Sequence, residues 1–90
     1  MHKGTVKIVN PLGLHARAAA QLVKLAGKFK SSIMLTRPDE GIHANAKSLL
    51  SVLTLAASYG TVLDMSAEGA DEDDAFREIL HLFEIGFGEI

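Results

Sequence analysis

Apolar residues recur along this chain with two different spacings, and the spacings predict its secondary structure. Alternation of apolar and polar residues is typical of half-buried strands, and it is found at residues 5–9, 32–36, 42–44 and 61–67. Apolar residues three and four positions apart are typical of amphipathic helices, and they are found at residues 16–28, 47–55 and 72–87. Each helix has one apolar stripe and each strand one apolar face. We therefore expect an α+β fold of order βαββαβα, in which three helices cover one face of a mainly antiparallel four-stranded sheet.

The same patterns predict which side chains face the core and where helices begin. In the second helix the inward residues are expected to be Val52, Leu55 and Ala56. Asp71 is expected to cap the last helix, because the acidic residues that follow it suit the positive end of the helix dipole. The apolar stripe of that helix is expected to run as far as Phe87.

Composition and charge exclude several classes of protein. The 90 residues contain no cysteine and carry a formal net charge of −2. The lack of cysteine excludes disulfides and thiolate metal sites, and the charge gives no support to nucleic-acid binding. No apolar run is long enough to span a bilayer, and the N-terminus lacks the apolar core of a signal peptide. We expect a single domain over residues 1–90 that acts as a cytoplasmic monomer.

The chemistry suggested by the sequence is concentrated where the first helix begins. Gly13 supplies a turn, His15 stands at the helix start, and Arg17 follows two residues later. The first amides of a helix lack intrahelical partners, and the helix dipole favours an anion there and disfavours an imidazolium. Arg17 adds permanently charged, planar donors that suit phosphate oxygens. This arrangement predicts a phosphoryl acceptor, with the amides of Ala16, Arg17 and Ala18 as an anion site.

Three stretches in order carry a resemblance to a known family. They are Gly13-Leu14-His15-Ala16-Arg17 with the following Ala19-Ala20-Gln21, then Asn45-Ala46-Lys47-Ser48-Leu49-Leu50, then Gly60-Thr61-Val62 leading to Ser66-Ala67-Glu68-Gly69. Together they resemble the histidine-containing phosphocarriers (HPr) of the phosphoenolpyruvate-dependent phosphotransferase system. The resemblance covers nearly the whole chain and implies an open-faced β-sandwich.

The resemblance also implies roles for particular residues. His15 would be phosphorylated on Nδ1 and Arg17 would contact the phosphoryl group. Ser48 would be a regulatory serine, phosphorylated by an HPr kinase in organisms that have one. The donor would be enzyme I and the acceptor a IIA-type protein. The apolar patch that docks these partners would contain Leu49, Leu50 and Leu53.

One face of the first helix is a second candidate for partner binding. Arg17, Gln21, Lys24 and Lys28 form a basic stripe that begins at the proposed phosphate site, and Ala20 lies within the same motif. Such a stripe is either a solvated helix face or a surface for an acidic partner. We expect Ala20, Gln21 and Lys24 to contact partners.

Some features depart from the family pattern or admit other functions. Ala18 stands where the sugar-transport carriers usually have proline, so this run looks more like the nitrogen-related branch of the family. A small acylphosphatase-like phosphohydrolase and a regulatory binder acting through Ser48 alone are the alternatives. The segment Gly86–Ile90 matches nothing with an assigned role.

The histidines give no sign of a metal site. His2, His15, His43 and His81 show no helical i, i+3 or i, i+4 pairing and have no cysteine companions. We therefore expect neither a metal nor another cofactor, with His2 in a frayed terminus and His43 and His81 on the surface.

Overall fold

The computed structural model describes residues 1–90, and its elements follow the predicted order. The strands are β1 (His2–Lys7), β2 (Ser32–Arg37), β3 (Ile42–Asn45) and β4 (Val62–Glu68). The helices are α1 (Ala16–Ala26), α2 (Leu49–Leu53) and α3 (Glu72–Glu84), followed by the 3-10 turn η1 (Gly86–Gly88).

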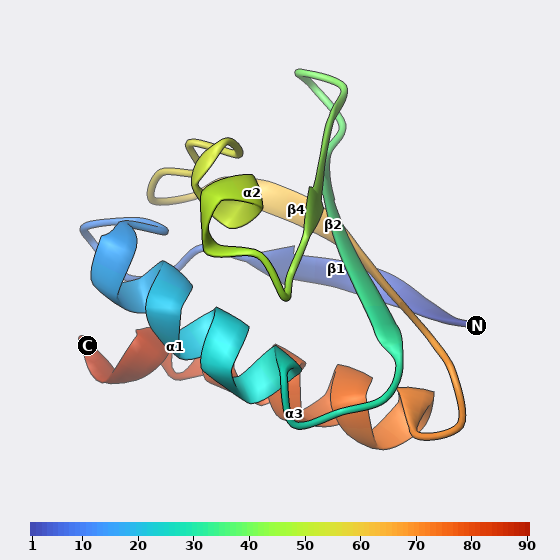
Figure 1. Ribbon diagram of the computed structural model, residues 1–90. Helices are drawn as coiled ribbons and strands as arrows, with labels where there is room; N and C mark the ends of the chain where they lie inside the picture. The colour runs from blue at the N-terminus through green and yellow to red at the C-terminus, as the bar shows by residue number, and fades with distance from the viewer.

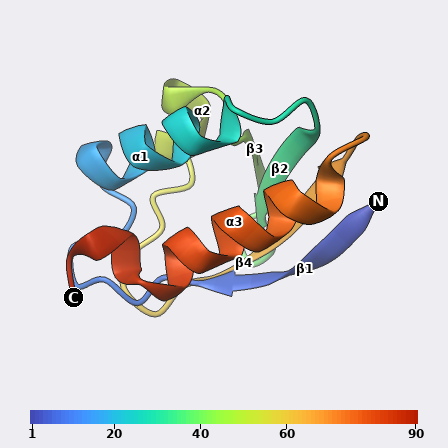
Figure 2. The same ribbon diagram turned by 90° about the horizontal axis from the view of Figure 1, so that it is seen from below.

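The four strands form one sheet in the spatial order β1-β4-β2-β3, and every neighbouring pair is antiparallel. All three helices lie on the same side of this sheet, as Figures 1 and 2 show from two directions. The predicted α+β, open-faced two-layer sandwich is therefore confirmed. No helix has both the length and the apolar character needed to cross a membrane.

The core lies between the sheet and the helices. Inward side chains of the strands are buried, and those of Ile33, Leu35 and Leu63 are fully buried. Leu22 of α1 and Ile79 of α3 are also fully buried and close the layer from the helical side. This packing fixes where α1 begins relative to the rest of the chain, because α1 cannot slide without exposing its apolar stripe.

The first strand begins earlier than the alternation predicted, and His2 is not frayed. Its ring stacks on Phe76 with a centroid distance of 4.0 Å, and its Nδ1 lies 2.8 Å from an oxygen of Asp73. Gly4 leaves room for that aromatic ring, since a Cβ there would lie 2.7 Å from Phe76 Cζ. Both contacts of His2, Asp73 and Phe76, lie more than 70 positions away in sequence, so local alternation could not reveal them.

The helices end earlier than predicted. The first helix, α1, ends at Ala26 and not at residue 28. The second, α2, ends at Leu53, and the chain turns at Ala56, which has a φ of +46°. Ala56 is exposed, so the prediction that it faces the core is wrong. Arg37 stabilises this turn by donating to the carbonyl oxygens of Leu55 and Ala56, both at 3.0 Å. At the other end of the chain, Phe87 is buried as expected, but in η1 beyond the end of α3.

Asp71 precedes α3 but does not cap it with its side chain. Its carboxylate instead accepts hydrogen bonds from the amides of Lys30 and Ser31, at 2.8 and 2.9 Å, and from the Ser31 hydroxyl. These hydrogen bonds, that from the Ser31 hydroxyl foremost, lower the pKa of Asp71 from 3.8 to about 2. The Asp71 carboxylate thus connects the turn between α1 and β2 to the start of α3.

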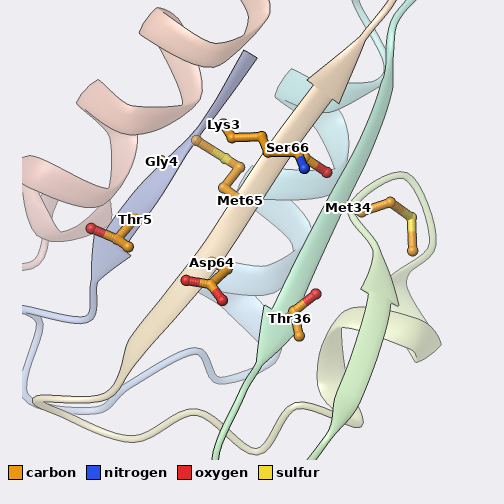
Figure 3. A pocket seen from close by; sticks show the side chains of 8 residues that line it. All are labelled: Lys3, Gly4, Thr5, Met34, Thr36, Asp64, Met65 and Ser66. Carbon is orange, nitrogen blue, oxygen red and sulfur yellow. The ribbon is translucent and has the colours of Figure 1, made fainter. Parts of the chain in front are cut away.

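The uncovered face of the sheet contains a shallow depression of about 430 Å³ (Figure 3). Lys3, Thr5, Thr36, Asp64 and Ser66 supply its polar side chains. It lies on the side of the sheet away from the helices, and therefore away from the start of α1.

Substitution of Asp71 by asparagine tests the connection described above. Because the pKa of the native carboxyl is lowered, its stabilising effect is complete above about pH 4 and is lost as the pH falls towards about 2. We expect Asp71→Asn to lower the Tm by several degrees at pH 7, and the difference from the wild type to shrink between pH 4 and 2. Thermal unfolding followed by circular dichroism measures this. Asp64→Asn, an exposed carboxylate with no hydrogen-bond partner, should leave the Tm unchanged. If Asp71→Asn lowered the Tm by the same amount at pH 2 and pH 7, the stabilising effect would not depend on the charge of Asp71.

Candidate functional site

A tight turn places the candidate nucleophile at the start of α1. Gly13 has a φ of +71°, and a Cβ at this position would lie 2.7 Å from the carbonyl oxygen of Ala57. The next amide, that of Leu14, donates to the same oxygen at 2.8 Å. Only glycine combines this backbone conformation with so close an approach. The turn is therefore held against the segment that follows α2, and α1 begins two residues after Leu14.

The residue after Leu14 is His15, and it is the N-cap of α1. Its Nδ1 accepts a hydrogen bond from the Arg17 amide at 3.3 Å, so Nδ1 carries no proton in this arrangement. The amides of Ala16 and Ala18 donate to no backbone carbonyl. The first turn of α1 thus has two open amides, those of Ala16 and Ala18, close to an imidazole nitrogen that is unprotonated and accepts from the Arg17 amide. Open amides at a helix start can bind an anion.

A carboxylate that the sequence analysis did not identify contacts the other side of the imidazole. Oε2 of Glu89 lies 2.6 Å from His15 Nε2, and Oε1 of Glu89 accepts a hydrogen bond from Asn10 Nδ2 at 2.9 Å. The hydrogen bond from Asn10, with a smaller contribution from that of His15, lowers the pKa of Glu89 although partial burial acts in the opposite direction. An ionised carboxylate is an acceptor only, so His15 Nε2 donates the proton.

The C-terminal segment brings Glu89 to this position. Gly86, Phe87 and Gly88 all have positive φ angles, between 57° and 76°, which turn the chain back towards α1 after α3 ends. Figure 1 shows this red segment returning to the start of α1. The carbonyl oxygen of Phe87 also accepts a hydrogen bond from Gln21 Nε2 at 3.2 Å. The glycines at 86 and 88 were the only local signal for this turn, and periodicity alone extended the helix through them.

Arg17, Gln21 and Lys24 lie on α1 as predicted, whereas Lys28 lies beyond the last residue of the helix, Ala26. Arg17, Ala20 and Lys24 are exposed, and Gln21 is half-buried by its contact with Phe87. No carboxylate lies within ion-pair distance of Arg17, so its guanidinium is free to contact an anion at the start of the helix.

Ser48 is the N-cap of α2, and its Oγ accepts a hydrogen bond from the Ser51 amide at 3.3 Å. The helix that it caps packs against α1 (Figure 2). Of the three leucines in the docking patch that the resemblance implies, Leu50 is 79% exposed and Leu49 is 40% exposed. Leu53 is half-buried and packs against the core.

No three histidine, aspartate or glutamate side chains are placed to hold a metal ion. His43 and His81 are exposed, as predicted. His43 contacts the Thr36 hydroxyl at 3.0 Å, within the β2–β3 hairpin and on a different face from His15.

The comparison with known families agrees with this geometry. Residues 2–84 match the model of the PTS-HPr family, described as the PTS HPr component phosphorylation site. The chain belongs to the HPr family. It is therefore related to the phosphocarriers of the phosphotransferase system, which are carriers of a phosphoryl group and not catalysts.

Curated relatives and solved structures give the same result. The phosphocarrier protein HPr of Neisseria meningitidis serogroup A is 40% identical over 99% of this chain and 98% of its own length. The phosphocarrier protein NPr of Proteus mirabilis is 43% identical over 93% of this chain and 92% of its own. The crystal structure of HPr-C-His from Thermoanaerobacter tengcongensis superposes with a TM-score of 0.93, at 41% identity, over 100% of this chain and 99% of that one.

The comparisons do not favour one branch of the HPr family. Identities of 40% to an HPr and 43% to an NPr are similar, so the alanine at position 18 remains the only feature that favours the nitrogen-related branch. In the structure Ala18 is fully buried. Its amide N–H donates to no backbone carbonyl. A proline at this position would have no amide N–H to offer to an anion.

Proposed function

We propose that this chain accepts a phosphoryl group on Nδ1 of His15 from enzyme I and passes it to a IIA-type acceptor protein. The observation that carries the proposal is the asymmetry of the imidazole. Nε2 contacts Glu89 at 2.6 Å, whereas Nδ1 faces the open amides of the first turn of α1. Nδ1 is thus the unprotonated nitrogen, and its lone pair can attack phosphorus once it leaves the hydrogen bond from the Arg17 amide. As for other carriers of this family, we expect the transfer to take place in the cytoplasm.

Positioning and charge stabilisation account for the transfer. The lone pair of Nδ1 forms a bond to phosphorus while the bond from phosphorus to the donor's histidine nitrogen breaks, and that nitrogen keeps the electron pair. The amides of the first turn and the guanidinium of Arg17 stabilise the oxygens of the transferring group. The bonds formed and broken are both between phosphorus and an imidazole nitrogen, so transfer is readily reversible and the carrier can pass the group on.

Substitution of His15 tests the site of phosphorylation. We expect wild-type protein incubated with phosphoenolpyruvate and enzyme I to gain one phosphoryl group that is stable in alkali and lost in acid. His15→Ala should gain none, while His43→Ala, which removes an exposed imidazole elsewhere, should behave as the wild type does. Intact-protein mass spectrometry measures the adduct. Release of free phosphate from an acyl phosphate, without enzyme I, would instead support an acylphosphatase-like hydrolase.

Substitution of Arg17 tests the stabilisation of charge. Because the side chain is exposed and has no ion-pair partner, Arg17→Ala should leave the Tm unchanged but slow transfer by an order of magnitude or more. Arg17→Lys should restore only part of the rate, since lysine lacks the planar fork. Lys7→Ala, which removes an exposed cation from β1, is the control in quench-flow measurements. Full activity in Arg17→Ala would assign the anion site to the backbone amides alone.

We further propose that Ser48 is a regulatory phosphorylation site acted on by an HPr kinase. Its hydroxyl caps α2 and is followed by the exposed Leu49 and Leu50. A phosphate at a helix start is locally favourable, so modification would not disrupt the fold. It would place negative charge beside apolar side chains that lose water when a partner docks, which opposes binding.

Replacement of Ser48 by aspartate tests this proposal. Ser48→Asp should keep the Tm of the wild type or raise it slightly, yet weaken the apparent binding of enzyme I. Ser48→Asn, a neutral N-cap of the same size, should bind as the wild type does. The penalty should shrink when salt rises from 20 mM to 300 mM, because screening weakens the repulsion. Calorimetric titration at both salt concentrations measures this. If aspartate and asparagine bound equally well, Ser48 would be a helix cap only.

A further inference from the structure

We propose that Glu89 is a positioning residue for phosphoryl transfer, which holds the proton of His15 on Nε2 so that Nδ1 stays nucleophilic. This inference rests on the proposed function and adds to it a residue outside the part of the chain that the family model matches, which ends at residue 84. Its basis is the chain of contacts from Asn10 through Glu89 to His15.

The first contact in this chain fixes the carboxylate. Asn10 is fully buried, and its Nδ2 lies 2.7 Å from the carbonyl oxygen of Gly13 and 2.9 Å from Glu89 Oε1. Both neighbours are acceptors, so this atom of Asn10 must be the amide nitrogen. Glu89 is therefore held by a donor that is itself anchored to the turn before α1.

The second contact fixes the imidazole. Glu89 Oε2 lies 2.6 Å from His15 Nε2, and the side chains of His15 and Glu89 are only 28% and 19% exposed. The Arg17 amide donates to Nδ1 on the opposite side of the ring. The two hydrogen bonds specify the same tautomer, with the proton on Nε2 and the lone pair on Nδ1.

The carboxylate also faces the charge that develops during transfer. When Nδ1 bonds to phosphorus the imidazole ring becomes cationic, and its Nε2 proton remains shared with Glu89. No proton has to leave. An acceptor that orients a histidine and stabilises its cationic form accelerates reactions in which that histidine acts as a base or nucleophile.

The C-terminal segment is built to keep Glu89 in place. Phe87 is 3% exposed, and its ring packs edge-on against Phe83 at a centroid distance of 5.1 Å. The Phe87 carbonyl accepts from Gln21, and the Glu89 amide donates to the carbonyl of Gly86 at 3.0 Å. Only one residue separates Glu89 from the buried Phe87, so the side chain of Glu89 has little freedom to move.

Glu89→Gln should move the imidazole proton from Nε2 towards Nδ1 while keeping the size of the side chain at position 89. Asn10 requires an oxygen opposite its amide nitrogen, so the glutamine would direct its NH₂ group towards His15 Nε2. Nε2 would then accept, and the proton would shift towards Nδ1. We expect ¹⁵N chemical shifts of the imidazole to report the Nε2–H tautomer in the wild type and an increased Nδ1–H population in Glu89→Gln. The rate constant for phosphoryl transfer from enzyme I should fall about tenfold or more, with KM unchanged. Glu84→Gln, an exposed glutamate of α3, is the matched control and should match the wild type in both measurements.

Each outcome decides the inference. A fall in rate together with the tautomer shift, in Glu89→Gln alone, supports it. Unchanged ¹⁵N shifts in Glu89→Gln overturn it whatever the rates, as does an unchanged rate, or an equal loss in Glu84→Gln. Failure of the proposed function itself gives a different result, since wild-type protein would then gain no phosphoryl group on His15. The tautomer measurement needs no partner protein and would still decide whether Glu89 positions the imidazole.

Discussion

The close packing of the Gly13 turn against the carbonyl oxygen of Ala57 is the constraint on which the site depends. The turn approaches so closely that no side chain fits at position 13, and the hydrogen bond from Leu14 to the same oxygen leaves it little freedom. His15 therefore reaches the helix start with its orientation already limited. The amides of α1, the contact with Glu89 and the exposure of Arg17 all follow from where this turn places the helix.

The two nitrogens of the His15 imidazole face environments of opposite charge. Helix amides favour an anion beside Nδ1, whereas Glu89 provides negative charge beside Nε2. The two do not cancel, because they act on different atoms of His15. One side offers hydrogen-bond donors to an anion, and the other tolerates a cationic ring.

Sequence patterns predicted the order of elements because each strand and helix buries one face, and that requirement is local. His15 and Ser48 could be placed at helix starts for the same reason, since a helix start is visible in a few consecutive residues. The errors arose where distant residues decide the local structure. Arg37 determines how the chain turns after α2, and Lys30 and Ser31 engage the side chain of Asp71. Glu89 is 74 residues from His15, and no periodicity connects them.

The uncovered face of the sheet gives alternate residues of each strand different freedom to change during evolution. In β1, Val6 faces the helices and is buried, whereas its neighbours Thr5 and Lys7 face solvent. A substitution at the first kind of position changes the layer that positions His15, while one at the second kind need only preserve strand geometry and solubility. A chain with this architecture can therefore acquire new surface chemistry on half of every strand while the opposite layer stays intact.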